Sequence, residues 1–192
     1  MHRFLANDEY VDFDAERIQA AAFELFSDGM GEIEKARAAF EFVRDEIPHS
    51  FDCNAQVITA RASDVLKHRT GICHTKANLL AALLRSQGIP AGFCFQRITL
   101  DDDDSMGYCV HAFNSVYLNG RWIKLDARGN KPGIETHFSL EEPSLAFECR
   151  PGFDEYFWDG IYAESHLPTM KVLEESSCLQ DLMEKLPDDI GV

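Results

Sequence analysis

The sequence lacks any apolar run long enough to cross a membrane. A membrane-spanning helix needs about 18 consecutive apolar residues, and no stretch of the 192-residue chain approaches that length. The N-terminal segment, MHRFLANDEY, reaches acidic residues before the apolar core of a signal peptide could form. We therefore expect a cytoplasmic protein that does not bind a membrane.

Basic residues are scarce. The chain has 18 Lys and Arg against 33 Asp and Glu, which gives a formal net charge of -15. A surface with this charge repels nucleic-acid phosphates and anionic lipids. We therefore exclude nucleic acid as a partner. The chemistry of the residues described below leads us to expect a peptide or protein substrate. Oligomeric state stays open.

The sequence also lacks C-x-x-C pairs, because its six cysteines are scattered singly along the chain. This scatter favours free thiols over a disulfide framework or a zinc site. The acidic run from Asp101 to Asp104 lacks the alternating ligand spacing of a calcium loop, so a solvated turn is favoured there. We predict no metal site and no cofactor.

Apolar residues at helical spacing predict helices over residues 15–26, 32–45, 64–68 and 173–186, with Ser63 as the N-cap of the third. The strongest pattern covers residues 73–87, where apolar positions form a wide stripe that ends at Gly88. So much apolar surface indicates a central, buried helix. Residues 49–62, between the second and third predicted helices, show no sustained apolar periodicity and are predicted to be a surface loop.

Strand patterns follow that central helix. Residues 92–100 form one candidate strand, and residues 109–118 and 121–129 form two more. The last two are separated by Asn119-Gly120, the dipeptide best suited to a tight hairpin because both residues tolerate a positive φ. We therefore predict an antiparallel hairpin here.

Cys73 occupies the first turn of the central helix. Unpaired backbone N–H groups and the positive end of the helix dipole favour a thiolate at such a position. Gly71, two residues earlier, would leave room for a substrate backbone. The N–H of Cys73 could also donate to an oxyanion.

The predicted hairpin brings a histidine and an aspartate together. Counting back from its two loop residues puts Phe113 opposite Asp126, so His111 and Asp126 become diagonal neighbours on one face. An imidazole and a carboxylate can form a hydrogen bond over that separation. Asp126 would then fix the tautomer of His111 and leave its other nitrogen to exchange a proton with Cys73.

These three residues predict cysteine-based acyl transfer. Cys73 would attack an amide or ester carbonyl, and His111 would protonate the leaving group. Water or an amine would then resolve the thioester, with His111 as general base.

The blocks Gly71-Ile72-Cys73, LLAALLRSQGIPA, Val110-His111-Ala112-Phe113 and RWIKLD resemble the signature regions of the transglutaminase-like superfamily, in the matching order Cys, His, Asp. The resemblance covers roughly residues 35–130. It implies an α+β, papain-like core in which the catalytic cysteine opens a central helix packed on an antiparallel β-sheet. It also implies a single stand-alone domain of bacterial type over residues 1–192, with N-terminal helices and a C-terminal extension.

The resemblance carries the roles of nucleophile, base and orienting residue onto Cys73, His111 and Asp126. Members of this superfamily include transamidases, peptidases, glycanase-like amidases and proteins that have lost activity. We therefore predict a peptidase, amidase or transamidase acting on a peptide-like amide. The alternative is an inactive domain that serves as a protein-interaction module.

Several neighbouring residues leave alternatives open. Gln56 and His49 are both candidates for the second oxyanion donor. Cys109 is interpreted as a packing residue, with a redox partner for Cys73 as the other possibility. Arg128 either binds a substrate carboxylate or forms a surface ion pair. His74 is not expected to chelate a metal with the adjacent cysteine, because neighbouring helical side chains diverge.

Overall fold

The computed structural model describes residues 1–101 and 104–191. Asp102 and Asp103, the middle of the predicted acidic turn, lie outside the described residues. Within the described ranges, none of the helices combines the length and apolar character that a membrane span requires.

Helices and strands combine as the α+β prediction requires. Their order along the chain is a 3-10 helix η1 (His2–Leu5), α1 (Glu16–Leu25), α2 (Glu32–Glu46), α3 (Ala62–His68), α4 (Cys73–Ser86), β1 (Ala91–Thr99), β2 (Tyr108–Leu118), β3 (Arg121–Leu125), β4 (Tyr156–Phe157), α5 (Leu167–Glu175) and α6 (Leu179–Lys185).

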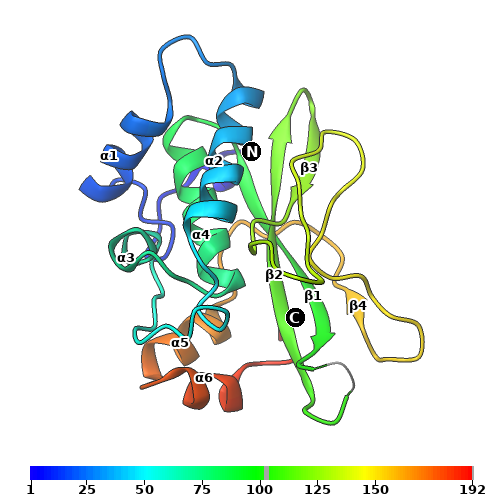
Figure 1. Cartoon of the computed structure of the whole chain (residues 1–192). Coiled ribbons are helices and arrows are strands. Elements are labelled where there is room, and N and C mark those ends of the chain that lie inside the picture. The colour runs from blue at the N-terminus through cyan, green and yellow to red at the C-terminus, as the bar shows by residue number, and fades with distance from the viewer. Residues whose placement is uncertain (102–103, 192) are drawn as a thin grey trace.

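The four strands form an antiparallel sheet in the order β3-β2-β1-β4. Figure 1 shows the first four helices on one side of this sheet, with α5 and α6 beside its lower end. The segment after β3, drawn in yellow, passes alongside the sheet before the chain returns as β4. The first turn of α4 and the lower half of β2 therefore face each other across the layers.

Helix α4 forms the centre of the core, as its apolar stripe predicts. Every residue from His74 to Arg85 is buried, and α4 contacts α1, α2, α3 and both long strands. Burying each leucine of this helix contributes about 1.5–3 kcal/mol relative to exposure. The helix that carries Cys73 is therefore held on all sides, which fixes the position of its first turn.

The hairpin between β2 and β3 has the predicted register. Leu118 pairs with Arg121 and Asn114 pairs with Leu125. Asn119 and Gly120 both have positive φ, at 50° and 79°, as a tight two-residue turn requires. The third strand ends at Leu125, so Asp126 lies one residue beyond the ladder.

Several boundary predictions are wrong. The strand predicted over residues 121–129 ends at Leu125. Helix α3 begins at Ala62 with Arg61 as its N-cap, and no side chain caps it, so Ser63 lies inside the helix. The helix predicted over residues 173–186 is two helices, because Ser176 adopts an extended backbone and ends α5. Cys178 is the N-cap of α6.

Candidate active site

Cys73 is the first residue of α4, and the cap before it, Ile72, supplies no side-chain hydrogen bond. The approach of the chain to this position depends on Gly71. A Cβ at Gly71 would lie 2.4 Å from the Thr75 hydroxyl oxygen, so only glycine fits. The space that we expected to admit a substrate backbone is instead filled by this side chain.

His111 and Asp126 meet as the hairpin register predicts. Nε2 of His111 and Oδ2 of Asp126 are 2.8 Å apart, and both side chains are buried. Because Nε2 is used in this bond, Nδ1 is the nitrogen left for the hydrogen bond between His111 and the Cys73 thiol. The structure thus brings all three predicted residues together.

The His111 charge is favoured by both of its partners in this triad. Burial would raise the pKa of Cys73, but the His111 imidazolium and its hydrogen bond to the sulfur outweigh burial and hold that pKa below its usual value. Burial would likewise lower the pKa of His111, but Asp126 and the Cys73 sulfur raise it to about 10. Both shifts favour a thiolate and an imidazolium over the uncharged thiol and imidazole.

Asp126 is held by the backbone as well as by His111. The N–H of Arg128 donates to Oδ1 at 3.1 Å, and the N–H of Ala146 donates to Oδ2 at 2.9 Å. These bonds and His111 together keep the pKa of Asp126 below its usual value, against the effect of burial. The carboxylate is therefore fixed in position and ionised.

Sequence reasoning missed the contribution of the segment around Phe147. The Phe147 ring packs edge-on against His111, with ring centroids 5.0 Å apart, and its carbonyl accepts a hydrogen bond from Gln96. This segment lies about 20 residues beyond the hairpin and has no regular structure, so no periodicity could have placed it. It covers one side of the histidine.

His49 lies beside Cys73, although it is not arranged as an oxyanion donor. Its Nε2 accepts a hydrogen bond from the Cys73 N–H at 3.1 Å. Burial, followed by the nearby Arg128 charge, keeps the pKa of His49 well below its usual value, so the ring is neutral. The two groups that we expected to point together at an oxyanion are instead bonded to each other.

Gln56 is not a site residue. Its side-chain amide donates to the carbonyl of Asn54 at 2.9 Å and is exposed, and Gln56 lines a separate pocket beside α5. The loop 49–62 turns back on itself after His49 and carries Gln56 away, because Cys53 and Ala55 hydrogen-bond to the loop's first residues. The prediction that Gln56 supplies an oxyanion donor is wrong.

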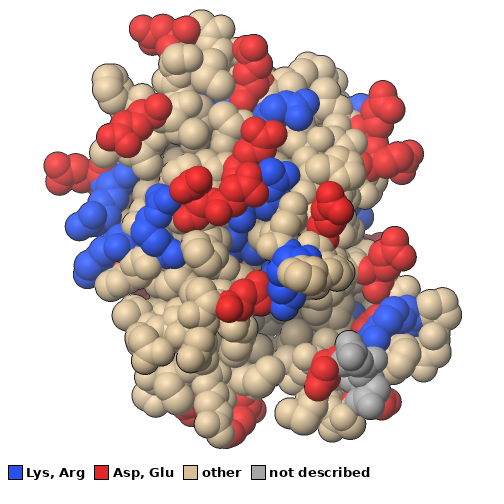
Figure 2. All heavy atoms as spheres, viewed as in Figure 1, with Lys and Arg blue, Asp and Glu red and all other residues tan. Residues whose placement is uncertain are grey.

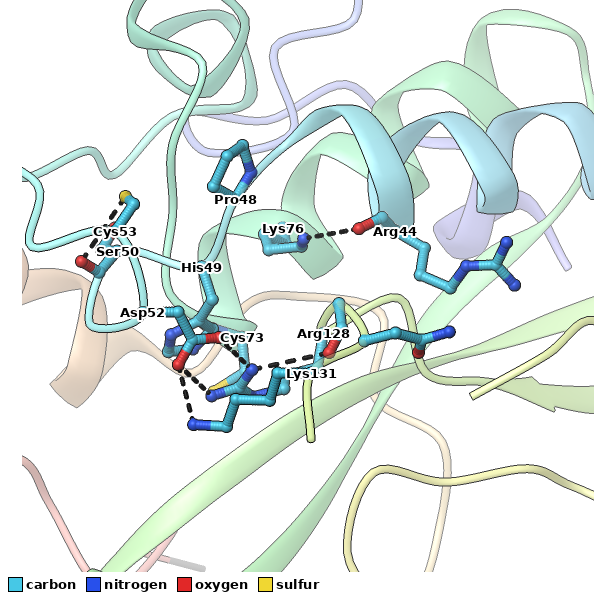
Figure 3. Close-up of polar contacts among 12 residues, drawn as sticks. Arg44, Pro48, His49, Ser50, Asp52, Cys53, Cys73, Lys76, Arg128 and Lys131 are labelled. Carbon is cyan, nitrogen blue, oxygen red and sulfur yellow. Dashed lines mark hydrogen bonds and ion pairs between the residues drawn. The ribbon is translucent and has the colours of Figure 1, made fainter. Parts of the chain in front are cut away.

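Arg128 forms an internal ion pair at the rim of the site. Its two terminal nitrogens bond the two carboxylate oxygens of Asp52, and Lys131 Nζ lies 2.8 Å from the same carboxylate. Figure 3 shows Asp52 facing both cations. Partial burial would raise the pKa of Asp52, but these two partners lower it to about 2. Of the two fates expected for Arg128, the structure has an ion pair, in which Arg128 is buried and Asp52 is partly exposed.

Two further residues near Cys73 remain neutral. Burial and the charge of the Cys73 sulfur raise the pKa of Cys109 to about 12, so its thiol is protonated and packs against the site. Burial lowers the pKa of His74 to about 3, and its Nε2 lies 2.8 Å from the Val110 carbonyl. That bond turns His74 toward the strand.

The triad opens onto a cleft of about 710 Å³. Cys73 is partly exposed there. Figure 2 shows this face hollowed in its lower half, with charged side chains along the upper rim. Apolar side chains from several elements line much of it: Phe51, Ile72, Ile98, Leu100, Val110, Pro132, Ile134, Phe147, Met183 and Leu186. Charged residues also line it: Asp52, Asp101, Arg128, Lys131, Glu148, Arg150 and Glu155. The segment after Asn130 and helix α6 thus both form walls of the cleft.

Comparison with known families identifies the architecture. The model of the transglutaminase-like superfamily matches residues 19–127, more than half of the chain. The chain belongs to this superfamily. The match begins in α1 and ends one residue after Asp126, so it contains all three triad residues and confirms the expected fold.

A solved structure shows the same relationship. A proposed cysteine protease from Cytophaga hutchinsonii is 26% identical to this transglutaminase-like chain, with a TM-score of 0.50. The similarity covers 65% of this chain and 40% of that protein, so this chain matches less than half of the relative's length. No curated protein matches the chain significantly. Together these findings establish the superfamily and its fold.

Proposed function

We propose that this protein is a cysteine-dependent acyl-transfer enzyme that acts on an amide bond of a peptide or peptide-like substrate. The observation that carries the proposal is the bond between His111 Nε2 and Asp126, which leaves Nδ1 for the partly exposed Cys73 sulfur in an open cleft. The apolar part of the lining suits an uncharged peptide segment.

The first half-reaction forms a thioester. The Cys73 thiolate attacks the amide carbonyl, and the C–N bond breaks as the His111 imidazolium gives its proton to the departing amine. The charge on Asp126 stabilises the imidazolium until that transfer. We place the developing oxyanion against the Cys73 N–H, which would exchange its bond to His49 for one to the substrate.

The second half-reaction releases the acyl group. Neutral His111 removes a proton from water, for hydrolysis, or from an amine, for transamidation, as that nucleophile attacks the thioester. The C–S bond then breaks and regenerates the thiolate and imidazolium pair. Both outcomes use the same triad, so the nature of the second nucleophile decides between them.

Selective alkylation tests the activated thiolate. At pH 6 to 7, iodoacetamide should modify Cys73 faster than Cys178, an exposed cysteine at the N-cap of α6, with both sites followed by mass spectrometry. A Cys178→Ala variant should keep the wild-type rate at Cys73. Equal rates at the two sites would refute the thiolate and with it the proposal.

A substrate panel tests the reaction itself. The wild-type protein and its Cys73→Ala variant should be incubated with peptide, glutamine-donor and glycopeptide substrates, each with and without an added primary amine. We expect turnover by the wild type alone, and the amine adduct distinguishes transamidation from hydrolysis. Activity retained by Cys73→Ala would exclude this nucleophile.

A further inference from the structure

A buried lysine lies one helical turn after the proposed nucleophile. Lys76 is 1% exposed, and it belongs to α4, the helix that begins at Cys73. The proposed chemistry assigns no step to this residue. Burying a lysine is costly unless its nitrogen is hydrogen-bonded, so its contacts explain why it is tolerated.

The nitrogen of Lys76 caps another helix. Its Nζ donates to the carbonyl of Arg44 at 3.5 Å and also to the carbonyl of Ile47. Figure 3 shows the Lys76 side chain directed at the Arg44 carbonyl. Both carbonyls lie at the end of α2, where helical carbonyls have no partner within the helix and a cation is favoured. Lys76 therefore joins the start of α4 to the end of α2.

The end of α2 leads directly to His49. Only Pro48 separates Ile47 from His49, and His49 accepts the Cys73 N–H. The same stretch also contacts the chain just before the nucleophile, because His49 and Gly71 form an isolated parallel β-bridge. The cap by Lys76 thus holds the segment that contacts the Cys73 backbone.

A third segment meets the same nitrogen. Gly129, three residues after Asp126, has a φ of +111°, and a Cβ there would lie 3.3 Å from both Lys76 Nζ and the Arg44 carbonyl oxygen. The chain that follows Asp126 therefore packs directly against the capped end of α2. Only a glycine leaves this contact unstrained.

Either protonation state of Lys76 can maintain these contacts. Burial, followed by the Arg128 guanidinium, lowers the pKa of Lys76 to about 7, while Asp126, Asp52 and Asp45 oppose that change. The ammonium has three N–H donors and the neutral amine has two. Two donors suffice for the two carbonyls.

We propose that Lys76 is a positioning residue, which holds the segments that carry Cys73, His49 and Asp126 in one fixed arrangement. This inference rests on the proposed function, since it concerns the reactivity of the same thiol. Lys76 itself touches no reacting atom. Its removal should move the segments relative to one another and separate the sulfur from His111.

The test compares Lys76→Met with a matched control, Lys35→Met. Lys35 Nζ lies 2.9 Å from the side-chain oxygen of Gln87, so it joins α2 to the far end of α4. The pseudo-first-order rate of Cys73 alkylation by iodoacetamide is measured from pH 5 to 9 on full-length protein. We expect Lys76→Met to react about tenfold more slowly at pH 6, with a higher pH midpoint, because small misplacements of reacting groups are costly. Lys35→Met should match the wild type.

The possible outcomes separate the two claims. Wild-type rates and midpoints in Lys76→Met would overturn the positioning role and leave the proposed function standing. Equal losses in both variants would also overturn it, because the effect would then come from general helix packing. If Cys73 of the wild type reacts no faster than Cys178, the proposed function fails first.

Two further variants, Lys76→Gln and Gly129→Ala, keep the test decisive if Lys76→Met does not fold. Lys76→Gln keeps an uncharged donor for one carbonyl and should have an intermediate rate. If neither Lys76 variant folds by circular dichroism, Gly129→Ala decides, because it displaces the same contact and leaves the lysine in place. A folded Gly129→Ala protein with lowered Cys73 reactivity supports the proposal, and unchanged reactivity overturns it.

Discussion

Replacing Asp126 by Asn tests how far one buried charge controls the nucleophile. The change removes the negative charge next to His111 and keeps the size of the side chain. His111 should then bind its proton less tightly, so the imidazolium that stabilises the Cys73 thiolate is lost at lower pH. We expect Cys73 to become less reactive at weakly alkaline pH, where the wild-type imidazolium persists.

The distances in the structure set the magnitude. His111 Nε2 and Asp126 Oδ2 are 2.8 Å apart. Charge centres about 4 Å apart interact by about 4 kcal/mol at an effective dielectric constant of about 20. Since about 1.4 kcal/mol corresponds to one pKa unit, the pKa of His111 should fall from about 10 by about 1 to 3 units.

The same variant should also lose stability. Asp126 accepts hydrogen bonds at both oxygens, from Arg128 N–H at Oδ1 and from His111 and Ala146 at Oδ2. An asparagine amide must place its NH2 group against one of these donors. The unpaired donors should cost about 1–3 kcal/mol of unfolding free energy.

Both effects can be measured on the same protein. The alkylation rate of Cys73 between pH 5 and 9 gives the pH midpoint, and urea denaturation at pH 7 gives the unfolding free energy. Cys178 serves as the internal reference, since its rate should not change. A folded Asp126→Asn protein with the wild-type pH profile would refute the electrostatic coupling.

Three further predictions concern stability and are read from urea or thermal unfolding. Arg128→Met should lower the unfolding free energy by about 1–2 kcal/mol at pH 7, a modest loss because Asp52 is partly exposed. Since the pKa of Asp52 is lowered to about 2, the ion pair contributes above about pH 4 and its contribution is lost as the pH falls toward 2. An equal cost at pH 7 and pH 2 would contradict this prediction. Gly92→Ala should lower the unfolding free energy by about 1–3 kcal/mol, because the new Cβ would lie 2.6 Å from the Ile161 side chain and 2.8 Å from a backbone carbonyl oxygen. An unchanged melting temperature would show that the clash is relieved. Leu80→Ala should cost about 2–5 kcal/mol because Leu80 is fully buried, and a loss below 1 kcal/mol would contradict the tight packing of α4.

The sequence predicts the triad because each of its parts depends on local rules. The position of Cys73 follows from a helix whose apolar period and glycine exit are both strong. The relation of His111 to Asp126 follows from a two-residue turn, which leaves one register for the hairpin. These rules act over fewer than about 20 residues, so a single sequence contains enough information to apply them.

The surroundings of the triad depend on contacts that no local rule describes. Phe147 reaches His111 from an irregular segment, and Asp52 reaches Arg128 across the loop after α2. Gln56 and His49 lie in one irregular stretch and were equally plausible from the sequence. They differ in the structure because His49 pairs with Gly71 while Gln56 turns away.

The position of His49 shows that a side chain near the nucleophile does not have to act as an oxyanion donor. Proximity was predicted correctly, but a neutral imidazole with its acceptor nitrogen toward Cys73 takes up the backbone N–H instead of adding a donor. If the Cys73 N–H must bind the oxyanion, His49 competes with the substrate for it. His49→Phe should then raise the affinity of a peptide aldehyde for Cys73, because the competing acceptor is gone. Weaker binding in this variant would show that His49 supports the site by holding the N–H in place.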